Sequence, residues 1–298
     1  FKYATIMKIF KVAFTGLVVL ASSFGFAQTN VLEYNSNATP LDGHAFVKHH
    51  DYQNRVLDYP FVREDDILWS KTYIQRLDLR QRKNHPLYFP TYPVKTGGGE
   101  VRMNLADNIL KAVMEDQSLT AYVDEYFDEV VTVEKIQKML FAIDTVEYED
   151  IDTGELVNEV DTIRVESKDI KEYLIIEDRF FDKKRSVIDV RILGLCPVAE
   201  IMNKETLEVE KVKLFWIWLP EARQLLANAS VFNTNNNIER LTYDEFLHKR
   251  LFASVITKET NLYDRAIFEY KKDRMHQLLE AERIKNDIRN LESDLWEY

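Results

Sequence analysis

Runs dense in β-branched and aromatic residues mark the second half of the chain and predict a β-sheet there. Residues 171–198, KEYLIIEDRFFDKKRSVIDVRILGLCPV, predict two strands joined by the polar turn from Asp182 to Arg185. Residues 211–220, KVKLFWIWLP, predict a third strand. Because these apolar runs are nearly continuous, we expect both faces of the sheet to be buried, with helices as the cover.

Apolar and polar residues alternate from residue 143 to 166 on either side of a turn at 152–154, which is typical of an antiparallel hairpin. The turn is acidic but does not have the spacing of an EF-hand calcium loop. Counted from Asp150, the glycine falls at the fifth position, and the twelfth position is Asp161 instead of glutamate. We therefore predict a hairpin without calcium.

Residues 63–79, REDDILWSKTYIQRLDL, show a different pattern. They begin with acids, as helices prefer, and Trp69, Tyr73 and Ile74 join other apolar residues on one broad face. This predicts a helix, which should end before Pro86, where the first of three closely spaced prolines forces extended backbone.

Helical spacing predicts further helices around the strands. Asn104 is a candidate N-cap for the helix that follows it. A shorter helix is expected over 132–143, Pro220 suits the first turn of another, and Thr242 with Glu245 has the spacing of a capping box. The last segment, Tyr263 to Trp296, has neither glycine nor proline and predicts one long, largely exposed helix. Its heptads are imperfect, which favours contact with a partner over a self-standing coiled coil.

The N-terminal segment predicts export. Residues 1–27 combine an upstream extension with two lysines, an apolar run and small residues ending at Ala27, the layout of a secretory signal peptide. Residues 28–60 are rich in Asn, Asp and His without a sustained apolar period, which predicts an extended arm. The rest divides into residues 61–168, an α+β region with the acidic hairpin, and residues 169–298, an α+β region with the terminal helix.

The predicted fold class is therefore α+β, with antiparallel sheet elements covered by helices, an extended N-terminal arm and a long C-terminal helix. The net charge is −11, and removal of residues 1–27 would take away three lysines and no acids, leaving −14. Such a balance argues against binding to nucleic acid or to an anionic bilayer. After the signal segment we expect no membrane span, because no second apolar run is long enough.

Candidate chemistry is sparse. Cys196 is the single cysteine, which excludes an internal disulfide, and we expect it to be a buried thiol at a strand end. His44, His49 and His50 are close in sequence but lack a defined carboxylate partner. The glycines at 97–99 lack the ending of a phosphate-binding loop. We predict no catalytic residue, no cofactor and no metal site.

Charge is distributed unevenly along the chain. The segment from Glu115 to Asp161 holds fifteen acids and two lysines, whereas the segment from Ile67 to Pro90 is net positive by four. Surfaces of opposite sign steer and orient protein contacts. A cationic, aromatic-rich segment in an acidic protein is thus a candidate interface.

The predicted interface residues are Trp69, Arg76, Asp78, Arg80 and Asn84. On the expected helix, Arg76 and Arg80 lie one turn apart on one face, and Asp78 points to a different side of the helix. Two interpretations stay open. The arginines could dock onto a partner protein or an acidic surface of a neighbouring copy, or they could bind the acidic hairpin of their own chain.

Several blocks of the sequence resemble one protein family. WSKTYIQRLDLRQRKNHPLYFP, residues 69–90, is similar to a signature of the GldN/PorN family of the Bacteroidota gliding motility and type IX secretion machinery. Further similar blocks lie at residues 177–195, 214–223 and 246–265 and in the closing LESDLWEY. The N-terminal arm and the acidic hairpin match least, and Cys196 stands where a small apolar residue is expected.

The resemblance implies a periplasmic structural subunit associated with the inner face of the outer membrane. It also implies many copies in a ring with a GldK/PorK-type outer-membrane lipoprotein, and contact with a GldM/PorM-type motor protein. It carries no catalytic residues over to this chain and implies no enzymatic activity. The alternative function is a periplasmic glycan- or peptide-binding module, which would bind a small ligand as a monomer. A hydrolase is a third class, and it would need a cleft with coupled carboxylates or histidines.

Overall fold

The computed structural model describes residues 54–95, 101–149, 156–202, 209–234, 236 and 239–295; for 141–149, 156–164 and 202 it describes the backbone alone. The predicted signal segment and most of the predicted arm lie outside the described residues. So do the three histidines of the arm, the glycines at 97–99 and the turn at 152–154.

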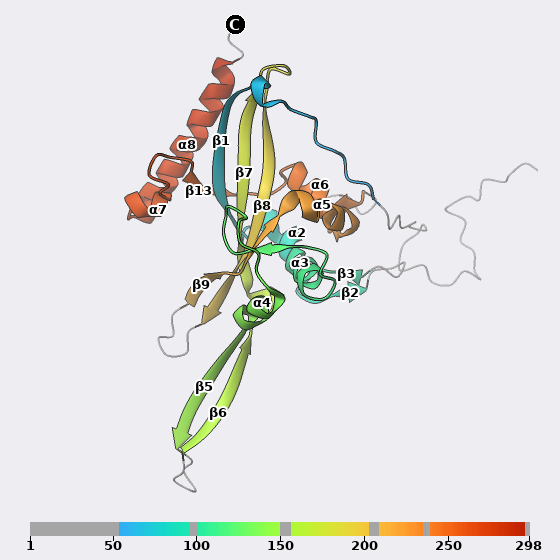
Figure 1. The fold of residues 1–298 in the computed structure, drawn as a ribbon, viewed down its shortest axis with the longest axis vertical. Coiled ribbons are helices and arrows are strands. Elements are labelled where there is room, and N and C mark those ends of the chain that lie inside the picture. Colours follow the sequence, from blue (N-terminus) through green and yellow to red (C-terminus); the bar gives the residue numbers. More distant parts are fainter. Residues whose placement is uncertain are drawn as a thin grey trace, which may run out of the picture. The chain divides into compact units, whose positions relative to one another are not determined.

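The main element of the fold is an antiparallel sheet of seven strands (Figure 1). Its order is β13-β1-β7-β8-β10-β4, and β9 also pairs with β8. The strands are β1 (Ile67–Asp78), β4 (Ala121–Tyr122), β7 (Ile170–Asp182), β8 (Val187–Met202), β9 (Val209–Lys213), β10 (Trp216–Trp218) and β13 (Val255–Glu259). The fold is α+β, as the sequence predicts, and the turn between β7 and β8 lies where it was expected.

Residues 67–78 form strand β1, so the predicted helix over 63–79 is wrong. The strand pairs with β7 from Ile67 to Asp78 and with β13 on its other side. Tyr73, Gln75 and Leu77 are buried while the residues between them are not, which is the period of two of a strand. The apolar positions fitted a helix as well, but two neighbouring strands satisfy the backbone of β1 and override the helical pattern.

The predicted third strand is divided in two. Strand β9 pairs with Val198–Met202 of β8, whereas β10 pairs with Gly194 and Leu195. Pro197 of β8 lies opposite the break and has no N–H to donate, although its carbonyl accepts from Leu214 N at 3.1 Å. Because Pro197 cannot donate a backbone hydrogen bond at this point, the pairing along β8 is interrupted, and residues 209–218 form two short strands.

Three two-stranded sheets lie outside the main sheet in the described part of the chain. Strands β5 (Phe141–Glu149) and β6 (Leu156–Arg164) form the predicted antiparallel hairpin as a two-stranded sheet of their own. Short pairs also form between β2 (Val94–Lys95) and β3 (Val101–Arg102), and between β11 (Ser230–Val231) and β12 (Leu241–Thr242).

The two predicted N-caps form, but at Thr242 the reciprocal bond from Thr242 N to the Glu245 carboxylate, which would complete the predicted capping box, does not. Asn104 Oδ1 accepts from Asp107 N at 2.7 Å and begins α3 (Leu105–Met114). Thr242 Oγ1 accepts from Glu245 N at 3.2 Å and begins α6 (Tyr243–His248). The other helices of this part are α2 (His85–Tyr88), α4 (Val133–Leu140) and α5 (Leu219–Asn228), which has Pro220 in its first turn.

Helices cover mainly one face of the sheet. The largest core cluster joins sheet residues such as Leu77, Tyr173 and Ile175 to residues of α3, α5 and α6. On the opposite face a smaller cluster of Ile176, Cys196 and Trp216 is covered by non-helical residues around Phe127. The expectation of helices over both faces is therefore wrong, and the second face stays partly open.

Cys196 is buried, as predicted, but it lies within β8 and not at its end. Burial raises the pKa of its thiol to about 12.

The predicted long terminal helix is shorter than expected. A short helix, α7 (Ile267–Tyr270), precedes α8 (Arg274–Asp294), and Lys271 between them has extended backbone. Upstream, Asn261 Oδ1 accepts from the backbone N–H groups of Tyr263 and Arg265 at 3.1 Å, which holds a turn where the helix was expected to begin. Helix α8 packs on β13 and β1, and Tyr73, Ile256 and Ile284 are buried in their shared cluster.

The cluster under α8 predicts the effect of shortening its side chains. Ile284 is buried, whereas Leu279 of the same helix is 58% exposed. Ile284→Ala should lower the free energy of unfolding by about 2–5 kcal/mol, because it leaves a cavity between α8 and the sheet. Leu279→Ala should change it by about 0.5 kcal/mol or less. Urea unfolding followed by circular dichroism measures both, and equal effects would contradict the packing described.

Candidate functional site

The predicted interface residues do not form one surface. Trp69, on β1, is half-buried and packs against the cluster between β1, β13 and α8. Asn84 is fully buried just after β1. Only Arg76, Asp78 and Arg80 lie at an accessible groove. The five residues predicted as one interface thus divide into two sets. Trp69 and Asn84 pack within the protein, whereas Arg76, Asp78 and Arg80 lie at its surface.

Asn84 connects the end of β1 to the segment before β13. Its Nδ2 donates to Asp78 O at 2.7 Å and to Ala253 O at 2.8 Å. Its Oδ1 accepts from Ala253 N at 2.8 Å. An amide is needed here, because the side chain both donates and accepts.

The two arginines bind carboxylates of their own sheet. Arg76 Nη1 lies 3.8 Å from Glu172 Oε1 of β7, and Arg80 forms an ion pair with Glu200 of β8. Asp78 Oδ1 accepts from Arg80 N at 2.9 Å. The expected helical face does not exist, because Arg76 and Asp78 lie in strand β1 and Arg80 follows it. The intrachain partners found among the described side chains are strand glutamates. The side chains of the hairpin acids lie outside the described residues, so both interpretations stay predictions.

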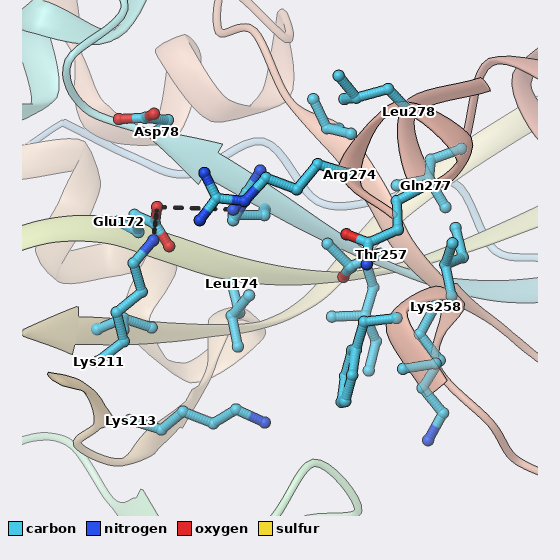
Figure 2. Close-up of a pocket in the computed structure, with 18 of the residues that line it drawn as sticks. Asp78, Glu172, Leu174, Lys211, Lys213, Thr257, Lys258, Arg274, Gln277 and Leu278 are labelled. Atoms are coloured by element: carbon cyan, nitrogen blue, oxygen red, sulfur yellow. Dashed lines mark hydrogen bonds and ion pairs between the residues drawn. The ribbon is translucent and has the colours of Figure 1, made fainter. Parts of the chain in front are cut away.

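The groove lies on the open face of the sheet, between β1, β7, β9, β13 and the start of α8, and has a volume of about 690 Å³ (Figure 2). We call it the basic groove after its six cations: Arg76, Arg80, Lys211, Lys213, Lys258 and Arg274. Three acids also line it: Asp78, Glu125 and Glu172. Cations therefore exceed acids in its lining by three.

At one end, Lys211 joins the arginine pairs. Its Nζ lies 2.5 Å from Glu172 Oε1 and 3.9 Å from Glu200 Oε1, and Figure 2 shows the side chain meeting Glu172. Because Glu172 is almost fully buried, two cations compensate for the loss of its hydration.

At the other end, Lys258 Nζ lies 2.6 Å from Glu125 Oε1 and 2.8 Å from Asp264 Oδ1. Burial works against the charge on Lys258, but hydrogen bonds to Asp264 and Glu125 outweigh it and raise its pKa. The hydrogen bond from Lys258, together with one from Tyr126, lowers the pKa of the Asp264 carboxyl.

Two cations of the basic groove are not neutralised. Lys213 of β9 and Arg274 of α8 are both exposed, and within the described ranges neither has a carboxylate oxygen within 4.0 Å. Figure 2 shows Lys213 coming from the β9 side and Arg274 from the helix side. Exposed Phe268 and Leu278 lie beside them, and Ile74 and Leu174 contribute apolar surface from the strands. This lining suits a partner that is both acidic and apolar.

A second groove lies on the other side of α8 and has a volume of about 700 Å³. Its cations are Lys83, Arg179, Arg250 and Lys285, and exposed Met275 and Leu279 line it. Leu278 lines both grooves, so the first turns of α8 form an apolar ridge between two basic surfaces.

Three carboxylates at or beside the groove are engaged in ion pairs. Glu172, Glu125 and Glu200 each have a cation partner. Among the described residues, no group of three or more His, Cys, Asp or Glu side chains is placed to hold a metal ion.

Sequence reasoning missed Lys211, Lys213, Lys258 and Arg274. They belong to β9, β13 and α8, far from residues 67–90 in sequence. The motif KVK was the available signal, because alternation places Lys211 and Lys213 on one face of a strand.

The hydrogen bonds of Asn84 predict a structural role for this residue. Asn84→Ala should lower the free energy of unfolding by about 2 kcal/mol or more, because it leaves buried polar groups at residues 78 and 253 without partners. Gln81→Ala, at an exposed position three residues earlier, is the control and should have little effect. Unfolding in urea gives both values, and an unaltered Asn84→Ala midpoint would contradict this role.

The chain matches the model of a known protein family. A family model described as "Gliding motility associated protein GldN" matches residues 62–297, which include β1 through α8. No curated protein matches the chain. Among the helices in the described part of the chain, none combines the length and the apolar character that crossing a bilayer requires.

Proposed function

We propose, because this chain belongs to the GldN family of gliding motility associated proteins, that it is a non-catalytic structural subunit of the gliding motility and type IX secretion machinery. In this proposal the subunit works in the periplasm. It assembles with a GldK/PorK-type lipoprotein into a ring under the outer membrane and contacts a GldM/PorM-type motor protein. Its role is to bind other proteins.

The basic groove is the observation that carries this proposal. Lys213 and Arg274 stay exposed beside Phe268 and Leu278, although an exposed cation next to an exposed apolar side chain contributes little to folding. Such a mixture of charge and apolar surface is typical of a protein interface. Glu125 and Glu172 at the groove are already bound to cations, and the lining holds three more cations than acids.

The interface hypothesis changes with the structure. Arg76 and Arg80 remain candidate contacts, because both side chains are partly exposed while they bind Glu172 and Glu200. Trp69, Asp78 and Asn84 would act indirectly, by positioning the strand and the turn that carry the arginines.

A peptide- or glycan-binding module remains the second candidate. The volume of the basic groove, about 690 Å³, falls in the range of small-ligand sites. The two functions differ in a measurable way. A ring subunit taken from the envelope through a tag on this chain should sediment as a very large complex that contains the lipoprotein. A binding module should instead be a monomer that a small ligand saturates.

The arginines allow a direct test of the assembly role. The double variant Arg76→Gln/Arg80→Gln removes two positive charges without placing like charges beside Glu172 and Glu200, which Lys211 continues to neutralise. We expect recovery of the lipoprotein in a pull-down to fall at least about tenfold, as loss of charged interface contacts commonly produces.

Lys111→Gln/Lys183→Gln removes the same charge from exposed positions outside the groove and should leave recovery unchanged. Thermal melts of all proteins check that the fold persists. Full recovery of the lipoprotein with the arginine variant, at an unchanged melting temperature, would reject the arginines as contacts.

A further inference from the structure

We infer that the basic groove receives the acidic hairpin β5–β6 of a second copy of this chain, so that copies associate head to tail. The inference rests on the proposed assembly role and specifies one contact within it. It concerns contact between copies, which can be measured without the lipoprotein.

The groove provides one half of the contact. Six cations line it against three acids, and Lys213 and Arg274 have no ion-pair partner among the described residues. The whole chain has a net charge of −11, so this surplus of positive charge is opposite in sign to the molecule as a whole. A second copy is therefore a ready source of the opposite charge.

The hairpin provides the other half. The sequence from residue 141 to 164 holds eight acids and one arginine, interspersed with Phe, Tyr, Val, Ile and Leu. This composition matches both the charge and the apolar part of the groove lining. No other stretch in the described strands combines nine paired positions with such a charge.

The hairpin also has a physical reason to bind a cationic surface. Its register pairs Asp144 with Asp161, and like charges at directly opposed positions destabilise a strand pair. Strands β5 and β6 form a sheet of two strands, which is marginal in water without further packing. A positively charged partner would reduce the repulsion and supply that packing.

The groove cations engage other groups within their own chain. Arg76, Arg80 and Lys211 bind Glu172 and Glu200, and Lys258 binds Glu125 and Asp264, none of which belongs to the hairpin. Lys213 and Arg274 have no ion-pair partner among the residues that the structure describes. Because groove and hairpin are different parts of one chain, their contact is heterologous, and such contacts produce closed rings or open filaments.

Charge-swap variants test the inference with the purified chain. The groove variant Lys213→Glu/Arg274→Glu alters exposed cations that hold no ion pair within the described chain, so folding should be unaffected. The hairpin variant is Glu147→Lys/Glu159→Lys. By sedimentation velocity at about 50 mM salt, each variant alone should associate at least about tenfold more weakly than the unaltered chain.

An equimolar mixture of the two variants is the decisive sample. The positive hairpin of one variant then faces the negative groove of the other, so association should return in the mixture while each variant alone stays dissociated. Lys111→Glu/Lys183→Glu, which reverses two exposed lysines outside the groove, should associate like the unaltered chain. Raising the salt to about 500 mM should weaken association of the unaltered chain.

The inference is overturned if the unaltered chain does not self-associate, if the groove variant associates normally, or if the mixture does not restore association. A pull-down with the lipoprotein separates this failure from failure of the proposed function. For the groove variant Lys213→Glu/Arg274→Glu, loss of self-association with lipoprotein binding retained supports the inference. Loss of lipoprotein binding with self-association retained in this variant would assign Lys213 and Arg274 to the lipoprotein. That outcome contradicts the inference and agrees with the proposed function.

Discussion

The placement of β13 and α8 beside β1 depends on one buried carboxylate, Glu177 of β7. It has no exposed surface, and burying a charge costs several kcal/mol unless it is paired. Its Oε2 accepts from Gln75 Nε2 at 2.7 Å and from Arg179 Nη2 at 3.3 Å. Arg250 Nη1 lies 2.6 Å from Oε1, in the geometry of an ion pair and not of a hydrogen bond. Ser254 in turn donates to Gln75, so Glu177 attaches residues 250–254 to the sheet.

This attachment determines where the last strand and helix lie. Asn84 holds Ala253 by two hydrogen bonds, and β13 begins two residues later at Val255. Once β13 is fixed beside β1, the cluster of Ile256, Ile267 and Ile284 brings α8 over this edge of the sheet. Both grooves form on the two sides of α8, so a polar network inside the protein sets the shape of its outer surface.

The sequence predicted elements whose signal is local and failed where tertiary contacts decide. Asn104 and Thr242 cap their helices through bonds to residues three positions on, and these were predictable. The helix expected over residues 63–79 was wrong because its apolar spacing suits either structure, and only the pairing with β7 and β13 decides. The break between β9 and β10 depends on Pro197 of the neighbouring strand β8. The residues from 211 to 220 by themselves therefore do not predict it.

The candidate site was predictable only in part, for a related reason. Arg76 and Arg80 were identified from local charge, but Lys213 and Arg274 reach the same groove from elements that only the fold brings together. The alternation of β1 then explains how core side chains and a groove arginine can lie within the same twelve residues. Tyr73 and Leu77 face the core, whereas Arg76 faces the groove. A slip of one residue would exchange the two sets, so the pairing that stabilises the sheet also fixes the charge of the groove.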